Sequence, residues 1–254
     1  MTPGDADQDA PYPSPPVILI TRPEAQGRAL ARRLGLKGWA PVLCALTVLR
    51  PLRAPIDLSG LAGLVFTSAN AVRAADLPPE ARALPAWCVG PATAAAARDA
   101  GFAPRVGPSD AAALAAMIVA ARPDGPLLHL RGVHGTDGLR QTLTKAGVAL
   151  RDTEVYEMVA LDRIAPPAAD ALLSGEVRAA AFYSPRTAQV FADRIAAQPD
   201  LGAGLHRVAA AAISTTTARI LAGLGFAQVL TAALPDGDAM DGAIARLKTA
   251  PRRI

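Results

Sequence analysis

The 254-residue sequence predicts an α/β protein with parallel sheets, and two observations carry this prediction. Short, nearly continuous apolar runs alternate with helical patterns along most of the chain, as in parallel sheets that helices cover on both faces. In addition, one short sequence pattern occurs twice. Phe66–Val72 reads Phe-Thr-Ser-Ala-Asn-Ala-Val, and Phe182–Ala188 reads Phe-Tyr-Ser-Pro-Arg-Thr-Ala. In both copies an apolar run ends at a serine, where a helix N-cap is expected.

Composition narrows the class of protein. The hydrophobic content of 51% is enough for a large core, and the net charge is only +4 with no basic block, so nucleic acid is a weak interpretation. The longest nearly uncharged apolar stretch, Ala111–Ala121, is too short to span a bilayer, and we expect a soluble cytoplasmic protein. Cys44 and Cys88 have apolar neighbours and form no Cys/His cluster, so we expect reduced core thiols and no metal.

The first elements follow from local patterns. Residues 1–16 are rich in Pro, Asp and Ser and should form a disordered leader. Val17–Ile20 is an aliphatic strand, and the segment from Thr21 opens a helix that reaches about Leu36. Residues 39–49 are apolar and extended. Two prolines in the following segment, 50–55, exclude both a helix and a central strand and predict a linker.

From Asp57 the alternation continues through the rest of the chain. The first half contains strand Leu64–Thr67, a helix from Ala69, strand Trp87–Gly90, helix Ala92–Ala100, strand Pro104–Val106, helix Asp110–Ala121, strand Leu127–Leu130 and a helix closed by Gly147. Residues 149–161 alternate and should be exposed on one face. The second half contains helix Ala168–Leu173, strand Ala179–Tyr183, helix Arg186–Ala197, strand Val208–Ile213, helix Thr216–Leu224, strand Gln228–Thr231 and helix Asp241–Lys248.

The repeat extends beyond this first pattern. Cys88–Ala94 corresponds to Ala212–Ala218, and Leu128–Gly132 corresponds to Leu19–Pro23. The last unit of the second copy therefore lies at the start of the chain. Such a permuted duplication predicts one domain built from both termini and another inserted into it. We expect domain 1 at residues 17–42 plus 163–254, domain 2 at 55–150, and interdomain linkers at 43–54 and 151–162.

The predicted strands end in small polar residues or arginine. Ligands of open parallel sheets bind beyond the carboxyl ends of the strands. The ends in question are Thr67-Ser68, Gly90–Thr93, Arg131-Gly132, Ser184–Arg186 and Ser214–Thr217. Two domains with such ends would form a cleft for several carboxylates or phosphates. Any single serine could be an ordinary N-cap, but recurrence in both halves favours a binding role.

The sequence contains no patterned nucleophile and base. His129, His134 and His206 have no patterned partner, and His129 lies inside an apolar strand, which favours a structural role. Tyr156 differs, because it lies in a partly exposed segment between the two domains. Its weakly acidic hydroxyl would then face the cleft, although packing is the simpler interpretation of a tyrosine.

Together these motifs resemble the uroporphyrinogen III synthase family over the whole chain after the leader. The motifs are Thr21–Pro23, Phe66–Val72, Val89–Ala94, Leu130–Gly132, Val155-Tyr156 and Phe182–Ala188. The resemblance implies two flavodoxin-like α/β domains joined by a two-stranded antiparallel linker. It also implies a cofactor-free hydro-lyase of haem biosynthesis. Its substrate would be hydroxymethylbilane, a linear tetrapyrrole with eight carboxylates, which the family cyclises with inversion of ring D and loss of water.

The resemblance also implies roles for particular residues. Tyr156 matches the family's linker tyrosine and would assist departure of the substrate hydroxyl. The expected substrate-binding residues, to which the strand-end pattern adds Ser214, are Ser68, Ala69, Thr93, Arg131, Ser184, Arg186, Ser214, Thr216 and Thr217. We expect a monomer that makes transient contact with hydroxymethylbilane synthase. The alternative is a non-catalytic tandem α/β module that binds another polyanion, whereas a nucleotide-dependent enzyme is disfavoured because no glycine fingerprint follows a strand.

Overall fold

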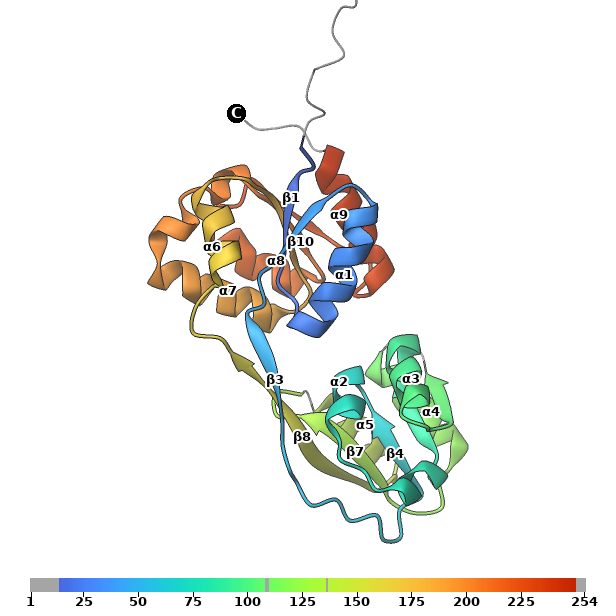
Figure 1. The fold of residues 1–254 in the computed structure, drawn as a ribbon. Coiled ribbons are helices and arrows are strands. Elements are labelled where there is room, and N and C mark those ends of the chain that lie inside the picture. Colours follow the sequence, from blue (N-terminus) through green and yellow to red (C-terminus); the bar gives the residue numbers. More distant parts are fainter. Residues whose placement is uncertain (1–13, 108–109, 136, 250–254) are drawn as a thin grey trace, which may run out of the picture. The chain divides into compact units, whose positions relative to one another are not determined.

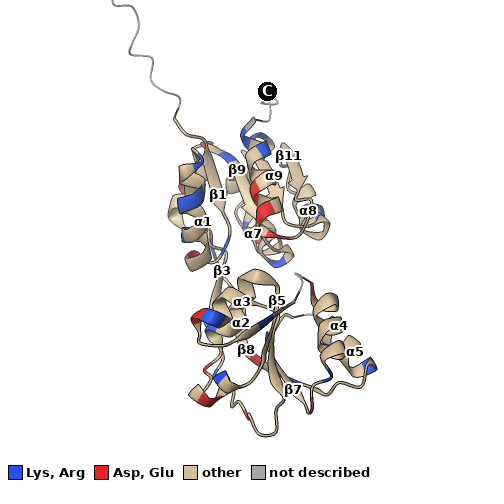
Figure 2. Ribbon diagram, turned by 90° about the vertical axis from the view of Figure 1, so that its right-hand side faces the viewer, with Lys and Arg blue, Asp and Glu red and all other residues tan. Residues whose placement is uncertain are grey.

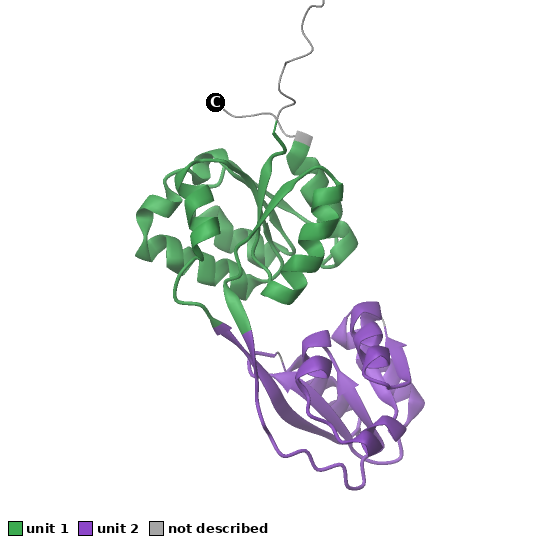
Figure 3. Cartoon of the chain, viewed as in Figure 1, with its two compact units in different colours: residues 1–48, 160–254 green, residues 49–159 purple. Residues whose placement is uncertain are grey.

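The computed structural model describes residues 14–107, 110–135 and 137–249. The expected leader, residues 1–16, therefore falls almost entirely outside the described residues. The chain divides into two compact units: unit 1 comprises residues 1–48 and 160–254, and unit 2 comprises residues 49–159 (Figure 3). Unit 1 is thus assembled from both ends of the chain, and unit 2 from its middle.

Unit 1 contains a sheet of five parallel strands in the order β11-β10-β9-β1-β2. Two of these strands, β1 and β10, are labelled in Figure 1. The strands are β1 Val17–Ile20, β2 Ala40–Leu43, β9 Val177–Phe182, β10 Ala209–Ala212 and β11 Gln228–Thr231. The helices are α1 Glu24–Leu36, α6 Pro166–Leu173, α7 Pro185–Ala197, α8 Thr215–Ala222 and α9 Gly237–Thr249, with 3₁₀ turns η2 Pro199–Gly202 and η3 Leu205–Arg207. Alternate residues of β1 enter opposite cores: Leu19 packs with α6, α7 and α8, whereas Ile18 and Ile20 pack with α1 and α9.

Unit 2 contains a six-stranded sheet in the order β3-β8-β7-β4-β5-β6. The strands are β3 Thr47–Pro51, β4 Gly63–Phe66, β5 Ala86–Val89, β6 Pro104–Gly107, β7 Leu127–Gly132 and β8 Leu150–Ala160. The helices are α2 Ala69–Ala74, α3 Gly90–Asp99, α4 Ala111–Ala121 and α5 Gly138–Lys145, with the 3₁₀ turn η1 Pro79–Ala83. Helices α2 and α3 cover one face of the sheet, and α4 and α5 cover the other.

The two sheets are permuted copies of one topology. The order β6-β5-β4-β7-β8 in unit 2 corresponds strand for strand to β11-β10-β9-β1-β2 in unit 1. Read along the chain, unit 1 has the flavodoxin-like order 2-1-3-4-5, and unit 2 has the same order with its first two strands moved to the end. The predicted α/β class and the permuted repeat are therefore confirmed by the topology.

Strand β8 differs from its sequence-based description. Residues 151–156 were expected in a linker, yet in this structure they pair in parallel with β7, from Leu127↔Leu150 to Gly132↔Tyr156. Strand β3 lies on the other side of β8 as the edge of the sheet. The amide of Leu52 donates to the carbonyl of Val155, and the amide of Leu161 donates to the carbonyl of Leu46. Residue numbers on the β3 side rise while those on the β8 side fall, so the two segments run antiparallel. Because β8 is only partly buried, it alternates like an exposed strand.

No helix among the described residues is long and apolar enough to cross a membrane. Cys44 and Cys88 are buried free thiols, and burial raises the pKa of Cys44 to about 12 and that of Cys88 to about 11. Both cysteines are therefore core residues, as expected from their apolar neighbours.

Candidate functional site

Each sheet has one topological switch point, where neighbouring strands continue to opposite sides of the sheet. It lies between β1 and β9 in unit 1 and between β7 and β4 in unit 2. In open α/β sheets a ligand binds at this point, beyond the carboxyl ends of the strands. The two copies of the repeated pattern follow β4 and β9, so both copies lie at a switch point.

In unit 1, two serines cap helices that begin at this edge. The Ser184 hydroxyl accepts a hydrogen bond from the Thr187 amide at 3.1 Å, and the Ser214 hydroxyl accepts one from the Thr217 amide at 3.3 Å. Each serine is also paired with the hydroxyl of the same threonine, at 2.6 Å in α7 and 3.0 Å in α8. The predicted N-caps are therefore present, and each is held in place by a threonine.

The remaining predicted residues of unit 1 differ in their exposure. Thr216 and Arg186 are exposed, each at the second position of its helix, next to the capping serine. Thr217 is 0% exposed, so in this structure it contacts Ser214 and not the solvent.

Tyr183 precedes Ser184 and has an unusual environment. The guanidinium of Arg22 lies 4.5 Å from the centre of its ring. Its hydroxyl is buried and has no hydrogen-bond partner among the residues that the structure describes. Burial raises the pKa of Tyr183 to about 12, and the carboxylate of Asp241 acts in the same direction while Arg22 and Arg33 oppose it. This tyrosine is therefore held in its neutral form inside unit 1.

In unit 2, the residues that directly follow β4 form one part of the carboxyl-end edge. The Ser68 hydroxyl accepts a hydrogen bond from the Asn70 amide at 3.1 Å, and Ala69 is the first residue of α2. Both residues are half-buried. Thr93 lies in the first turn of α3 and is buried. Ser68 and Ala69 are thus presented at the edge, and Thr93 lies beneath it.

Arg131 lies near the end of β7, and Tyr156 lies within the neighbouring strand β8. The Arg131 guanidinium donates to the Asp137 carboxylate at 2.8 Å and to the carbonyl of Gly135, so the side chain closes its own loop. Tyr156 is half-buried and pairs with Gly132 across the two strands. A Cβ atom on Gly132 would lie only 2.6 Å from Cζ of the Tyr156 ring. The distal end of the ring, which carries the hydroxyl, therefore rests on the backbone of Gly132.

A chain of hydrogen bonds runs beneath this edge, and no motif in the sequence predicts it. Nε2 of His129 lies 3.0 Å from the Thr67 hydroxyl, and Nδ1 lies 2.9 Å from an oxygen of Asp152. No sequence pattern links His129 to these partners, because adjacent parallel strands bring residues far apart in the sequence into register. The signal was present in the repeat, which aligns His129 with Ile20 and so marks a polar residue at a core position.

The Asp152 carboxylate also binds arginine. Nε of Arg140 donates to its second oxygen at 2.6 Å, a terminal nitrogen of the same guanidinium contacts that oxygen too, and Arg131 lies 3.8 Å away. Burial of the Asp152 carboxyl raises its pKa, but the hydrogen bonds from His129 and Arg140, together with the charge of Arg140, outweigh burial, and the pKa is lowered. Asp152 is therefore held as a carboxylate.

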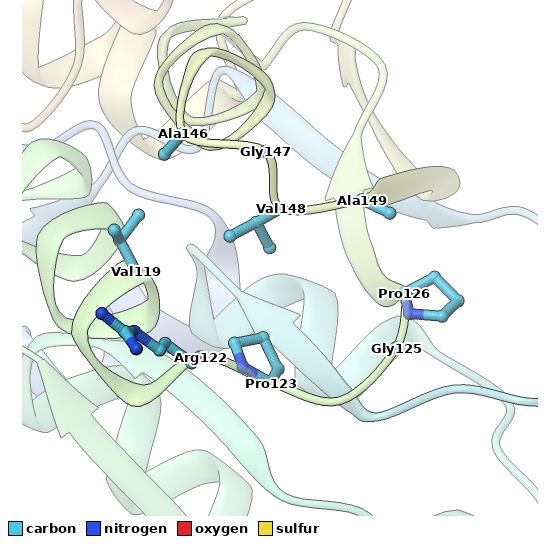
Figure 4. A pocket seen from close by; sticks show the side chains of 9 residues that line it. All are labelled: Val119, Arg122, Pro123, Gly125, Pro126, Ala146, Gly147, Val148 and Ala149. Carbon is cyan, nitrogen blue, oxygen red and sulfur yellow. The ribbon is translucent and has the colours of Figure 1, made fainter.

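A cavity of about 540 Å³ lies elsewhere in unit 2 (Figure 4). Its lining residues are Val119, Arg122, Pro123, Gly125, Pro126, Ala146, Gly147, Val148 and Ala149. Pro126 and Ala149 directly precede β7 and β8, so this cavity lies at the amino ends of the strands. It is thus at the edge opposite to the switch point and is not the expected ligand site.

Charged residues are spread over both units. Lys and Arg residues as well as Asp and Glu residues occur on the helices and loops of each one (Figure 2). Among the described residues there is no group of three or more His, Cys, Asp or Glu that could hold a metal ion.

Comparisons with known proteins agree with this architecture. The uroporphyrinogen-III synthase (HemD) family matches residues 28–241. A solved structure of uroporphyrinogen-III synthetase from Helicobacter pylori is 18% identical and covers 91% of this chain and 99% of that chain, with a TM-score of 0.65. A mutant uroporphyrinogen III synthase from the extremely thermophilic bacterium Thermus thermophilus is 19% identical, with coverages of 91% and 98% and a TM-score of 0.50. At these identities the structures support the fold alone.

Comparison with curated proteins gives no match. The family match nevertheless spans most of the sequence, and it includes both copies of the repeated pattern, the Arg131-Gly132 turn and Tyr156. This chain therefore belongs to the uroporphyrinogen-III synthase family, which comprises cofactor-independent lyases of tetrapyrrole biosynthesis.

Proposed function

We propose that this chain cyclises hydroxymethylbilane to uroporphyrinogen III with inversion of ring D and loss of water. One observation carries the proposal: equivalent carboxyl-end edges of two copies of one sheet bear the residues that the family resemblance selects. A substrate with eight carboxylates requires many anion contacts, and each of the two edges provides a set of them.

The helix starts of unit 1 supply contacts for carboxylates. Ser184 and Ser214 each satisfy the amide of the third helical residue, and the first turn of each helix faces the edge where an anion can bind. The partial positive charge of each helix N-terminus attracts the carboxylate further. Arg186 and Thr216 are exposed beside these helix starts, and we assign them direct contacts. Thr217, which is buried, acts through Ser214.

In unit 2 we assign Ser68 and Ala69 to the same task on a smaller scale. Thr93 supports the edge from beneath. Arg131 closes the loop after β7 through Asp137 and so shapes the edge. These assignments keep every residue that the resemblance selects, but they separate residues that touch substrate from residues that hold others in place.

Tyr156 is the proposed acid. Its hydroxyl proton passes to the hydroxyl group of the substrate's terminal hydroxymethyl carbon, the carbon–oxygen bond breaks, and water leaves. The resulting azafulvene cation is attacked by the substituted carbon of ring D, which gives a spiro-pyrrolenine. This intermediate fragments and recloses through the other α-carbon of ring D, so that the ring is inverted. The proton lost when the final pyrrole regains aromaticity restores the tyrosine. Holding ring D for the first attack is a positioning effect, for which rigid placement of the substrate is sufficient.

The proposal is tested by supplying hydroxymethylbilane to the purified chain and separating the products by isomer. We expect uroporphyrinogen III in excess of isomer I, which forms by spontaneous closure. Isomer I alone, at the spontaneous rate, would reject the enzyme and favour the non-catalytic module that binds another polyanion.

We further propose that the protein acts in the cytoplasm as a monomer and meets hydroxymethylbilane synthase only transiently. Sedimentation of the purified chain should give a single species of about 26 kDa. A stable dimer in this experiment would contradict the monomer.

A further inference from the structure

The chain of hydrogen bonds in unit 2 joins four side chains from different elements. It runs from the Thr67 hydroxyl, at the end of β4, through His129 of β7 to Asp152 of β8 and Arg140 of α5. His129 is only 3% exposed, and Thr67 is half-buried at the edge. We call these four residues the Thr67 relay. The relay connects Thr67, at the edge of the sheet, to the carboxylate of Asp152, which lies on the same face of the sheet but farther from the edge.

The equivalent positions of unit 1 are identified by strand pairing. In β1 and β2 the paired residues are Ile20 and Leu43, which are 23 residues apart, as are His129 and Asp152. Ile20, Leu43 and Tyr183 belong to one hydrophobic core, and Tyr183 holds the place of Thr67 before the capping serine.

The fourth position follows from the ends of the helices. Gly38 and Gly147 close α1 and α5 with the same φ of +76°. Counting seven residues back from each, Ala31 corresponds to Arg140. Unit 1 therefore fills every position of the relay with an aliphatic side chain or, at Tyr183, with a ring.

The fold does not require the relay. Burial of a histidine and a carboxylate costs desolvation free energy, and well-packed apolar residues can replace such groups without loss of stability. Unit 1 makes that replacement in the same topology. The relay thus has a role other than building the sheet, and its end at the carboxyl-end edge, the half-buried Thr67, indicates where that role is exerted.

The direction of the hydrogen bonds follows from charge. A carboxylate can only accept, so Nδ1 of His129 donates to Asp152. The Asp152 carboxylate is already paired with the guanidinium of Arg140 and lies 3.8 Å from that of Arg131, so a protonated His129 would add a third positive charge beside one carboxylate. In the neutral ring Nε2 is an acceptor, and the Thr67 hydroxyl must donate to it.

We propose that the relay fixes the Thr67 oxygen as a hydrogen-bond acceptor toward substrate, where it receives a pyrrole N–H and not a carboxylate. Its neighbour Ser68 already accepts the Asn70 amide and keeps its own hydroxyl hydrogen for donation. The two adjacent residues thereby differ in polarity, and a tetrapyrrole offers both partners. His129 and Asp152 are positioning residues here. The ligand class rests on the proposed function, whereas the tautomer does not.

The first test is nitrogen-15 NMR of the imidazole rings in the full chain, with the His129→Ile variant used to assign the His129 signals. We expect a neutral ring with the proton on Nδ1 and Nε2 unprotonated. A proton on Nε2, in either the other tautomer or the imidazolium, would overturn the proposal. This measurement decides the tautomer even if the wild-type chain yields only isomer I, an outcome that would reject the proposed function separately.

The second test transplants the unit 1 residues. In the variant His129→Ile/Arg140→Ala/Asp152→Leu, we expect a folded protein in which kcat/KM for hydroxymethylbilane falls about tenfold. Thr67→Val should cause a similar loss, Thr67→Ser should retain activity, and adding Thr67→Val to the transplant should cost nothing more. Full activity of the transplant, or additive losses, would contradict the relay. If the transplant does not fold, equal activity of Thr67→Val and Thr67→Ser would contradict it instead.

Discussion

The two switch-point edges of this protein have the same backbone topology and different chemistry. In unit 2 the face beneath the edge contains Thr67, His129 and Asp152, which are linked by hydrogen bonds. In unit 1 the equivalent face contains Tyr183, Ile20 and Leu43, which pack as a hydrophobic core. The sheet is stable with either set, so the difference shows that polar groups at these positions are an addition to the fold and not a condition of it.

A second difference lies in the length of the paired strands. Strand β2 ends at Leu43, the residue equivalent to Asp152, whereas β8 continues to Ala160. Tyr156 lies on this continuation. Tyr156, the residue proposed as the acid, thus lies on a continuation of β8 that has no counterpart in the sheet of unit 1.

The largest effect is expected from Tyr156→Phe. Loss of a general acid lowers turnover by about 10²–10⁴-fold, while the ring that packs on Gly132 is retained and the fold should persist. Single-turnover formation of uroporphyrinogen III measures the loss, and circular dichroism verifies folding. The control is Tyr183→Phe in unit 1. Unchanged turnover in the Tyr156 variant would remove this residue from the mechanism.

A smaller loss is expected from Gly132→Ala. The new Cβ would lie 2.6 Å from Cζ of Tyr156, so the ring must move, and a displacement of about 1 Å at a reacting group can cost about 10²-fold in rate. Gly138→Ala is the matched control, because apart from its chain neighbours and the backbone of its own helix no described atom lies within 4 Å of a Cβ at that position. Equal activity of the two variants would show that Tyr156 does not depend on Gly132 for its placement.

The pH dependence of stability should differ between the polar face of unit 2 and an apolar replacement of it. The pKa of Asp152 is lowered in the folded state, so its stabilising contribution is present above the unfolded pKa of about 3.9 and disappears as the pH falls through the folded value. We expect urea unfolding free energies to fall more steeply below about pH 4 in the wild type than in the transplant variant that carries Ile, Ala and Leu. Parallel pH profiles would contradict this assignment.

The smallest effect is expected from Tyr183→Phe. The buried hydroxyl has no partner within the described part of the chain, so its removal ends a desolvation cost, and the free energy of unfolding should stay constant or rise by about 1 kcal/mol. Thr67→Val, the equivalent change in unit 2, removes a hydroxyl that has a partner and should be the more damaging of the two. The comparison would fail if Tyr183→Phe were destabilising, since the hydroxyl would then have a favourable contact.

Much of the fold could be predicted because its signals are local. The apolar runs at Val17–Ile20 and Gln228–Thr231 are strands with the expected bounds, and Ser184 and Ser214 cap helices where the sequence places them. Strand β8 was harder, since its alternation reflects partial burial and does not reveal its partner. The bounds of single strands and helices depend on neighbouring residues, but the pairing of strands depends on residues far away in the chain.

By itself the sequence determined the α/β class, the permuted repeat and the residues at the strand ends, because periodicity and capping are properties of adjacent residues. Only the tertiary structure decided that His129 meets Thr67 and Asp152, that Tyr156 rests on Gly132, and that Thr217 is hidden behind Ser214. These contacts arise from the register of parallel strands and from burial. Neither quantity can be read from one segment, since each depends on what the rest of the chain places beside it.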